Sequence, residues 1–127
     1  MESFSFEKLQ AYQKARVLVK GIYNLNRKYP KEEIYALCNQ MRRAAISVSS
    51  NIAEGMGRSS IKEQIHFIEI SYGSLMELYS QLEVSLDLEY ITLEEFSEHK
   101  VLILDLAKML SKLRFIRTEK LKSETNG

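Results

Sequence analysis

Apolar residues recur every three or four positions along residues 60–89, and this pattern limits the fold more than any other feature of the chain. The apolar positions are Ile61, Ile65, Ile68, Tyr72, Leu75, Tyr79, Leu82 and Leu86. Spacings of three and four place side chains on one face of an α-helix, whereas a half-buried strand would alternate every second residue. The stripe lasts for almost four heptads. It therefore predicts one long amphipathic helix that buries a single face.

Three further segments have the same apolar spacing. They predict helices at about 6–28, 31–55 and 92–120, so the chain has four helical segments in all. Pro30 lies between the first two segments, where it would break a helix. The last residues, 123–127, are polar, and we expect them to fray.

Capping residues mark where these helices begin. Ser60 and Glu63 have the spacing of a capping box, and so do Thr92 and Glu95. In such a box the hydroxyl and the carboxylate each bind a backbone N–H that the first helical turn leaves unpaired. Ser5 is the expected N-cap of the first helix.

The connections between the predicted helices are short. A helix of 22 to 30 residues is about 35–45 Å long, and links of a few residues cannot cross that length. Consecutive helices must therefore lie side by side in opposite directions. The sequence predicts an all-α fold, a single antiparallel up-down-up-down four-helix bundle domain over residues 1–127.

The chain has more apolar surface than the core of one bundle requires. Residues 101–110, VLILDLAKML, have only Asp105 and Lys108 as polar positions. Other apolar residues lie beside or off the core stripes: Val17, Leu18, Phe67, Ile70, Leu78 and Val84. They either widen the ordinary core stripe or face another subunit. Because a helix that is apolar most of the way round is buried on more than one side, we expect a homo-oligomer.

Composition indicates a cytoplasmic protein that does not enter membranes. Hydrophobic residues make up 45% of the chain and charged residues 28%, as in soluble globular domains. No stretch approaches the roughly 18 apolar residues that span a bilayer, and MESFSFEK lacks the features of a signal peptide. Cys38 is the only cysteine, so no disulfide can form within the chain.

Charge is unevenly distributed although the net charge is only +1. Residues 1–60 hold ten Lys/Arg against five Asp/Glu, and residues 61–127 hold eight against twelve. The low net charge argues against strong general affinity for nucleic acid. A basic cluster stands out near the C-terminus: Lys108, Lys112, Arg114, Arg117, Lys120 and Lys122. Such a run usually forms a solvated helix face, and cations near a helix C-terminus also suit the helix dipole.

No residue pattern indicates an enzyme, a metal or a cofactor. GMGRSS, residues 55–60, lacks the lysine and the preceding strand of a phosphate loop, and a glycine that ends one helix before a serine that begins the next explains it. A weaker alternative is that the helix start beside Arg58 holds an anion. Glu63 and His66 have the spacing of a di-iron ligand pair but lie off the core stripe. Cys38 is expected to pack as a small hydrophobic residue.

The stretch QMRRAAISVSSNIAEGMGRSS, residues 40–60, is expected to pack closely against the third helix. A hairpin that turns near residues 57–58 would place Ser47 opposite Ile68 and bring Arg42 or Arg43 within one turn of Glu77. Small side chains on both helices would allow this close approach. The residues of the expected polar network are Gln40, Ser47, Asn51, Glu54, Ser74 and Glu77.

The same stretch resembles a bacterial family of four-helix-bundle proteins, the 23S rRNA-intervening sequence proteins. The resemblance rests on FEKLQAYQKA at residues 6–15, on residues 40–60, and on FIEISYGSLMELYSQLEVS at residues 67–85. It implies a homopentamer. The chain is also similar to the accessory variability protein of diversity-generating retroelements, a pentamer that binds nucleic acid and a reverse transcriptase. That relative is strongly basic, and a chain of net charge +1 departs from it.

Two functional hypotheses follow from these observations. In the first, the protein is a non-enzymatic, homopentameric RNA-binding protein whose partner is rRNA or another nucleic acid. Its expected phosphate contacts are Arg42, Arg43, Arg58, Lys108, Lys112, Arg114, Arg117 and Lys120. In the second, it is an oligomeric scaffold or adaptor whose partner is a protein, such as a nucleic-acid-processing protein. Burial of Arg42 and Arg43 against Glu77 would favour the second.

Overall fold

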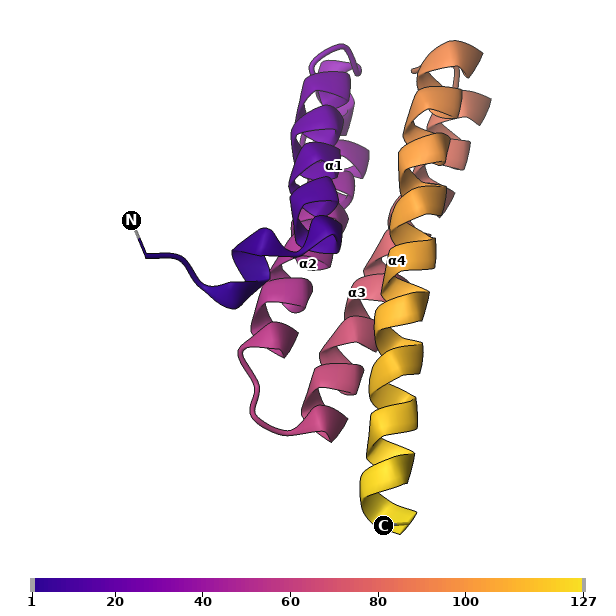
Figure 1. Ribbon diagram of the computed structural model, residues 1–127. Helices are drawn as coiled ribbons and strands as arrows, with labels where there is room; N and C mark the ends of the chain where they lie inside the picture. Colours follow the sequence, from indigo (N-terminus) through magenta and orange to yellow (C-terminus); the bar gives the residue numbers. More distant parts are fainter. Residues whose placement is uncertain (1, 127) are drawn as a thin grey trace.

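The computed structural model describes residues 2–126, and within them all regular structure is helical (Figure 1). These residues form four long helices, α1 (Gln10–Asn26), α2 (Leu37–Met56), α3 (Ile61–Asp87) and α4 (Leu93–Asn126). Two short 3-10 turns, η1 (Ser5–Lys8) and η2 (Lys31–Glu33), precede α1 and α2. The prediction of an all-α fold is confirmed.

Each long helix packs against two others. α2 lies between α1 and α3, and α4 lies between α3 and α1 (Figure 1). The core is apolar and receives side chains from all four helices, because the stripes at spacings of three and four face inward. The largest fully buried side chains are Leu18, Ile22, Met41, Ile52, Ile68, Leu75, Leu78, Leu82, Leu106 and Leu110. Burial of each such side chain contributes about 1.5–3 kcal/mol.

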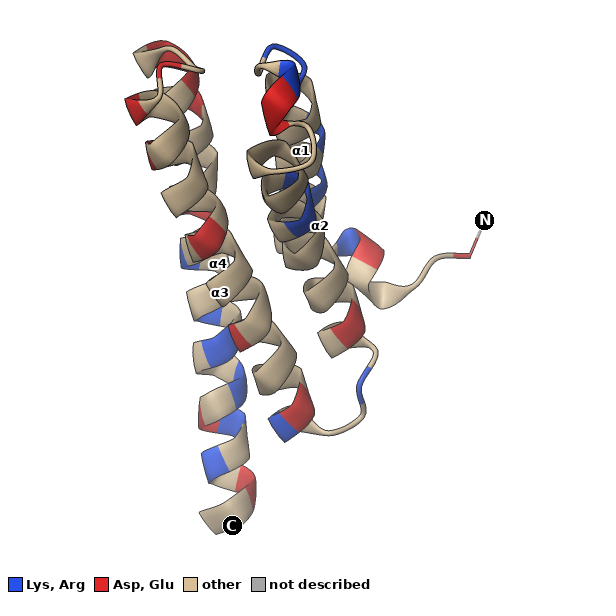
Figure 2. Ribbon diagram, turned by 180° about the vertical axis from the view of Figure 1, so that it is seen from behind, with Lys and Arg blue, Asp and Glu red and all other residues tan. Residues whose placement is uncertain are grey.

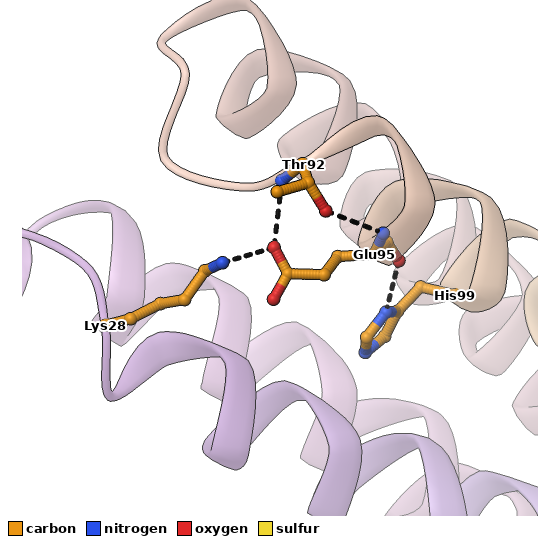
Figure 3. A network of polar contacts seen from close by, with 4 residues as sticks. All are labelled: Lys28, Thr92, Glu95 and His99. Atoms are coloured by element: carbon orange, nitrogen blue, oxygen red, sulfur yellow. Dashed lines mark hydrogen bonds and ion pairs between the residues drawn. The ribbon is translucent and has the colours of Figure 1, made fainter.

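The capping box of α4 is complete. The Thr92 backbone N–H donates to Glu95 Oε1 at 2.8 Å, and the Glu95 N–H donates to Thr92 Oγ1 at 3.1 Å (Figure 3). Glu95 also forms an ion pair with Lys28, which follows the end of α1. The Nδ1 atom of His99 lies 2.8 Å from the Glu95 carbonyl oxygen. These contacts join the end of α1 to the beginning of α4.

The first helix begins later than expected. Residues 5–8 form η1, Leu9 is extended, and α1 begins only at Gln10. Ser5 is not the N-cap of this segment, because Phe4 and Glu7 cap η1 instead. The Phe4 N–H donates to Glu7 Oε2 at 2.6 Å.

The second helix also begins later, at Leu37 rather than residue 31. Residues 31–33 form η2, whose backbone bonds are local, such as Ile34 N–H to Lys31 O at 3.1 Å. Glu33 accepts a hydrogen bond from the Tyr90 hydroxyl at 2.9 Å, which ties this turn to the α3–α4 connection. The turn is thus held by contacts that a continuous helix would not make.

The end of α4 differs from the prediction in the other direction. We expected a frayed tail at residues 123–127, but α4 continues to Asn126, and residue 127 lies outside the described part of the chain. Thr125 Oγ1 donates within the helix to the carbonyl oxygens of Leu121 and Lys122. No proline or glycine interrupts residues 93–126. The last turns of α4 extend beyond the beginning of α3 (Figure 1).

Candidate nucleic-acid interface

Basic residues gather on the C-terminal half of α4, as the sequence indicates (Figure 2). Lys108 and Lys112 are both exposed, and their spacing of four places them on one side of the helix. Lys120 is also exposed. Among residues 2–126 none of these three ammonium groups has an ion-pair partner within 4.0 Å. They are therefore free to meet an anion from solution.

The two arginines of this cluster are already engaged. Arg114 forms a 2.8 Å ion pair with Glu69 of α3. Arg117 is half-buried and donates to Gln64 Oε1 at 3.0 Å and to Met56 Sδ at 3.2 Å. Burial lowers the pKa of the Arg117 guanidinium, because desolvation disfavours its charged form. Arg117 therefore joins α4 to the α2–α3 end of the bundle.

Arg58 is a poor candidate for a phosphate contact. It forms ion pairs with Glu54 and, at 3.9 Å, with Glu63. Its guanidinium also lies over the Phe67 ring, 4.9 Å from the centroid. An anion at the start of α3 would have to compete with two carboxylates for this side chain.

Arg42 and Arg43 do not pair with Glu77, contrary to expectation. Arg42 donates to the Ile34 carbonyl oxygen at 3.2 Å and lies 5.7 Å from the centre of the Tyr23 ring. Arg43 is exposed and has no ion-pair or hydrogen-bond partner among the described residues. Burial of Arg42 and Arg43 against Glu77 would have weakened the nucleic-acid hypothesis, and residues 2–126 do not show it.

The register of α2 against α3 explains this difference. Ser47 Oγ lies 2.7 Å from Ser74 Oγ, and the Ser71 hydroxyl donates to Val48 O at 2.8 Å. The turn continues to residue 60, beyond the 57–58 assumed from the sequence. Ser47 contacts Ser74 and not Ile68.

Part of the expected polar network is present. Asn51 Nδ2 donates to Ser47 Oγ at 2.9 Å, so Asn51, Ser47 and Ser74 form one chain of contacts between α2 and α3. Glu54 pairs with Arg58 instead, and Glu77 accepts from Gln81 at 3.3 Å. Gln40 is exposed and takes no part in the network within the described residues. The network positions α2 and α3 against each other.

The bundle has a basic side and an acidic side, which the sequence alone did not predict. Residues 10–50 contain eight Lys/Arg and two Asp/Glu, whereas residues 61–107 contain two and ten. Because these stretches form neighbouring halves of the bundle, α1 and α2 make a basic flank and α3 with the first half of α4 makes an acidic flank (Figure 2). Dividing the chain at residue 60 hid this contrast, since the basic end of α4 was counted with the acidic helices.

Other kinds of site find no support in the described part of the chain. Residues 2–126 contain no group of three His, Cys, Asp or Glu placed to hold a metal ion. No helix in that range combines the length and apolar character that a bilayer-spanning segment requires. Cys38 is buried, and burial raises the pKa of its thiol, which disfavours the reactive thiolate.

Comparison with known proteins identifies the family. The family model described as 23S rRNA-intervening sequence protein matches residues 7–112. Solved structures share the fold, among them the crystal structure of a protein with unknown function from the S23 ribosomal protein family of Bacteroides thetaiotaomicron. It is 23% identical, with a TM-score of 0.76, and the match covers 82% of this chain and 94% of that chain. No curated protein matches the sequence.

Proposed function

Since the chain belongs to the 23S rRNA-intervening sequence protein family, we propose that it is a non-enzymatic homopentamer of the cytoplasm that binds structured RNA. In this proposal the protein contacts the phosphate backbone through exposed lysine and arginine side chains. The family name supports a connection with rRNA.

The observation that carries the proposal is the availability of Lys108 and Lys112. Both are exposed, unpaired among the described residues, and on one side of α4. Arg43 and Lys120 are also exposed and have no ion-pair partner among the described residues. Arg58 and Arg114, in contrast, are bound to carboxylates. Phosphate contacts of this type supply most of the affinity in sequence-independent recognition.

Exposed apolar residues support assembly into an oligomer. Leu18 and Leu78 belong to the core, but Val17, Ile70 and Val84 remain exposed. Val101 and Leu104 of α4 are exposed as well, at 62% and 49%. A basic flank and an acidic flank on one subunit also suit head-to-tail contacts, which close into a ring when the rotation between subunits permits. A ring of five would repeat a modest basic patch five times.

Contacts between the helices support the proposed antiparallel up-down-up-down path. Along α2 and α3 the pairs are Met41 with Ser85, Ser47 with Ser74, and Val48 with Ser71. Residue numbers rise on one helix as they fall on the other. The same holds between α1 and α4, where Lys14 pairs with Asp105 and Lys28 with Glu95.

The test is a titration of the purified protein with structured rRNA fragments across a range of salt concentrations. We expect saturable binding whose log Kd rises linearly with log salt, with a slope of roughly 0.7–0.9 per phosphate contact. The double variant Lys108→Ala/Lys112→Ala should weaken binding and reduce this slope. Lys100→Ala is the matched control, because Lys100 is an exposed lysine of α4 that lies over the rings of Tyr79 and Phe96 outside the basic half.

Absence of binding at low salt would overturn the RNA-binding proposal. If Lys100→Ala weakens binding as much as the double variant does, Lys108 and Lys112 are not the specific phosphate contacts. The remaining candidate is then an oligomeric scaffold for a protein partner, which the exposed apolar and acidic surface of α3 and α4 favours. A sedimentation or light-scattering mass of five chains tests the pentamer independently of RNA.

A further inference from the structure

Residues 2–4 form an arm that leaves the bundle on the side away from α3 and α4 (Figure 1 and Figure 2). Its direction is fixed at the root: the Phe4 N–H donates to Glu7 Oε2, and the Glu7 carbonyl accepts from Gln13 Nε2 at 3.1 Å. The Phe4 ring stacks on Phe6 at 6.1 Å but is 74% exposed. A large aromatic side chain held in this way resembles the anchor residues of protein interfaces.

An apolar groove of about 360 Å³ lies between the beginning of α1 and the C-terminal half of α4. Leu9 and Ala11 line it from the α1 side, and Met109, Leu113 and Ile116 line it from α4. Ile116 is 51% exposed. The groove is therefore large enough for an aromatic ring and leaves apolar surface in contact with water.

The arm and the groove lie at the same height along the bundle. Phe6, at the root of the arm, lines a hollow with Gly57 and Arg58 at the end of α2. The Arg58 carbonyl accepts from Gln64 at 2.7 Å, and Gln64 accepts from Arg117 at 3.0 Å. Arg117 is the residue after Ile116. Lys8 and Leu9 come two and three residues after Phe6 and line the groove themselves, so the root of the arm lies at the level of the groove.

Charge also matches the arm to the groove. Glu2 is exposed on the arm, two residues before Phe4. Lys8 lies on the groove lining, next to Leu9. A ring seated among Leu9, Leu113 and Ile116 would bring the acidic end of the arm toward this lysine.

We propose that the arm of one subunit docks into the α1–α4 groove of the next copy of this chain, with Phe4 as the anchor. The arm leaves from the α1–α2 side and the groove opens beside α4, so the contact is head-to-tail. At equal heights such contacts are suited to closing into a ring rather than a filament. This inference rests on the proposed homo-oligomer and specifies one of its interfaces.

Phe4→Ala tests the arm by its effect on association, measured as the subunit dissociation constant by analytical ultracentrifugation. Because the proposed contact buries the Phe4 ring, its removal should raise this dissociation constant by about 10- to 100-fold. Tyr35→Ala is the matched control, because Tyr35 is a 92% exposed aromatic residue outside the arm and the groove. Ile116→Asp, on the groove side, should weaken association as Phe4→Ala does. Circular dichroism checks that each variant remains helical.

Disulfide trapping identifies the contact itself. The variant Phe4→Cys/Ile116→Cys should give disulfide-linked dimers and higher species on a non-reducing gel, whereas Phe4→Cys/Ser80→Cys should not. Cys38 is buried and can stay in place.

The outcomes separate this inference from the proposal on which it rests. A wild-type protein that sediments as a monomer overturns both. A wild-type oligomer that Phe4→Ala leaves intact, with no trapped dimers, overturns the docked arm while the oligomer stands. Weakened association without trapping at residue 116 overturns the groove as the docking site.

Discussion

At the residue scale, Glu95 shows how one side chain joins separate parts of the fold. Its carboxylate accepts the Thr92 N–H at the beginning of α4 and pairs with Lys28 at the end of α1 (Figure 3). The Lys28 ammonium, followed by the Thr92 backbone N–H, lowers the pKa of Glu95 below its ordinary value near 4.5. Both contacts require the charged form, so the carboxylate stabilises the folded state only while it is ionised.

We expect Glu95→Ala to lower the free energy of unfolding by about 1 kcal/mol at neutral pH, the usual cost of a lost cap. Because the folded pKa is depressed, the contribution is complete above the unfolded value near 4.5 and disappears as pH falls through the folded value. Urea unfolding of wild type and variant between pH 7 and pH 3 checks this. Wild type and variant should converge at the acid end, and a difference that stays constant with pH would contradict the assignment.

Tyr29 gives a second prediction at this scale. Its buried hydroxyl makes no hydrogen bond within 3.5 Å among the described residues, although the Ser85 side chain lies nearby, and burial raises its pKa to about 12. A buried unpaired hydroxyl costs about 1–3 kcal/mol, so Tyr29→Phe should raise the free energy of unfolding by about 1 kcal/mol. Tyr90→Phe is the matched control, since Tyr90 donates to Glu33 at 2.9 Å and its ring lies 5.3 Å from that of Tyr29. Tyr90→Phe should destabilise the protein, and equal signs in urea unfolding would refute the contrast.

At the scale of the helices, capping chemistry predicted two boundaries well and missed two others. Ser60 and Thr92 cap α3 and α4 as their spacing to Glu63 and Glu95 indicated. The beginnings of α1 and α2 could not be read in the same way. Leu9 is extended, and Phe6 packs edge-on against Tyr12 at 4.8 Å, a contact between residues six apart that one continuous helix would not make. Local residue patterns do not encode such a contact.

Substitution by alanine should have opposite effects on stability at Gly55 and at Gly73. A Cβ at Gly55 of α2 would lie 2.9 Å from Phe67 Cβ, whereas a Cβ at Gly73 of α3 would meet nothing within 4 Å. Gly55→Ala should therefore destabilise the protein by about 1–3 kcal/mol through overpacking. Gly73→Ala should stabilise α3 by about 0.5–1 kcal/mol, since alanine loses less backbone entropy in a helix. Thermal unfolding compares the two, and a Gly55 variant at least as stable as wild type would contradict the close contact.

At the scale of the whole molecule, apolar periodicity was enough to predict four helices around one core. The surface was harder to predict, because exposure and pairing depend on register. The turn covers residues 57–60 instead of 57–58, Ser47 contacts Ser74 instead of Ile68, and Arg43 is exposed. Likewise, nothing in the spacing of Arg58, Arg114 and Lys112 distinguishes the two arginines bound to carboxylates from the free lysine. The sequence therefore predicts a set of candidate phosphate contacts, but it does not show which of these side chains are free and which are paired.

The opposed flanks lead to a prediction about assembly. Net charge is only +1, yet the α1–α2 flank and the acidic half of α3 and α4 carry opposite excess charges on one subunit. If the flanks of neighbouring subunits face each other, their attraction is screened as the Debye length falls from about 10 Å at 0.1 M salt to about 3 Å at 1 M. Apolar contacts are not weakened in this way. We therefore expect the subunit dissociation constant, measured by sedimentation without RNA, to rise between 0.05 and 1 M NaCl. An assembly that tightens or stays unchanged over this range would mean that apolar surfaces such as Val101 and Leu104, and not the charged flanks, hold the subunits together.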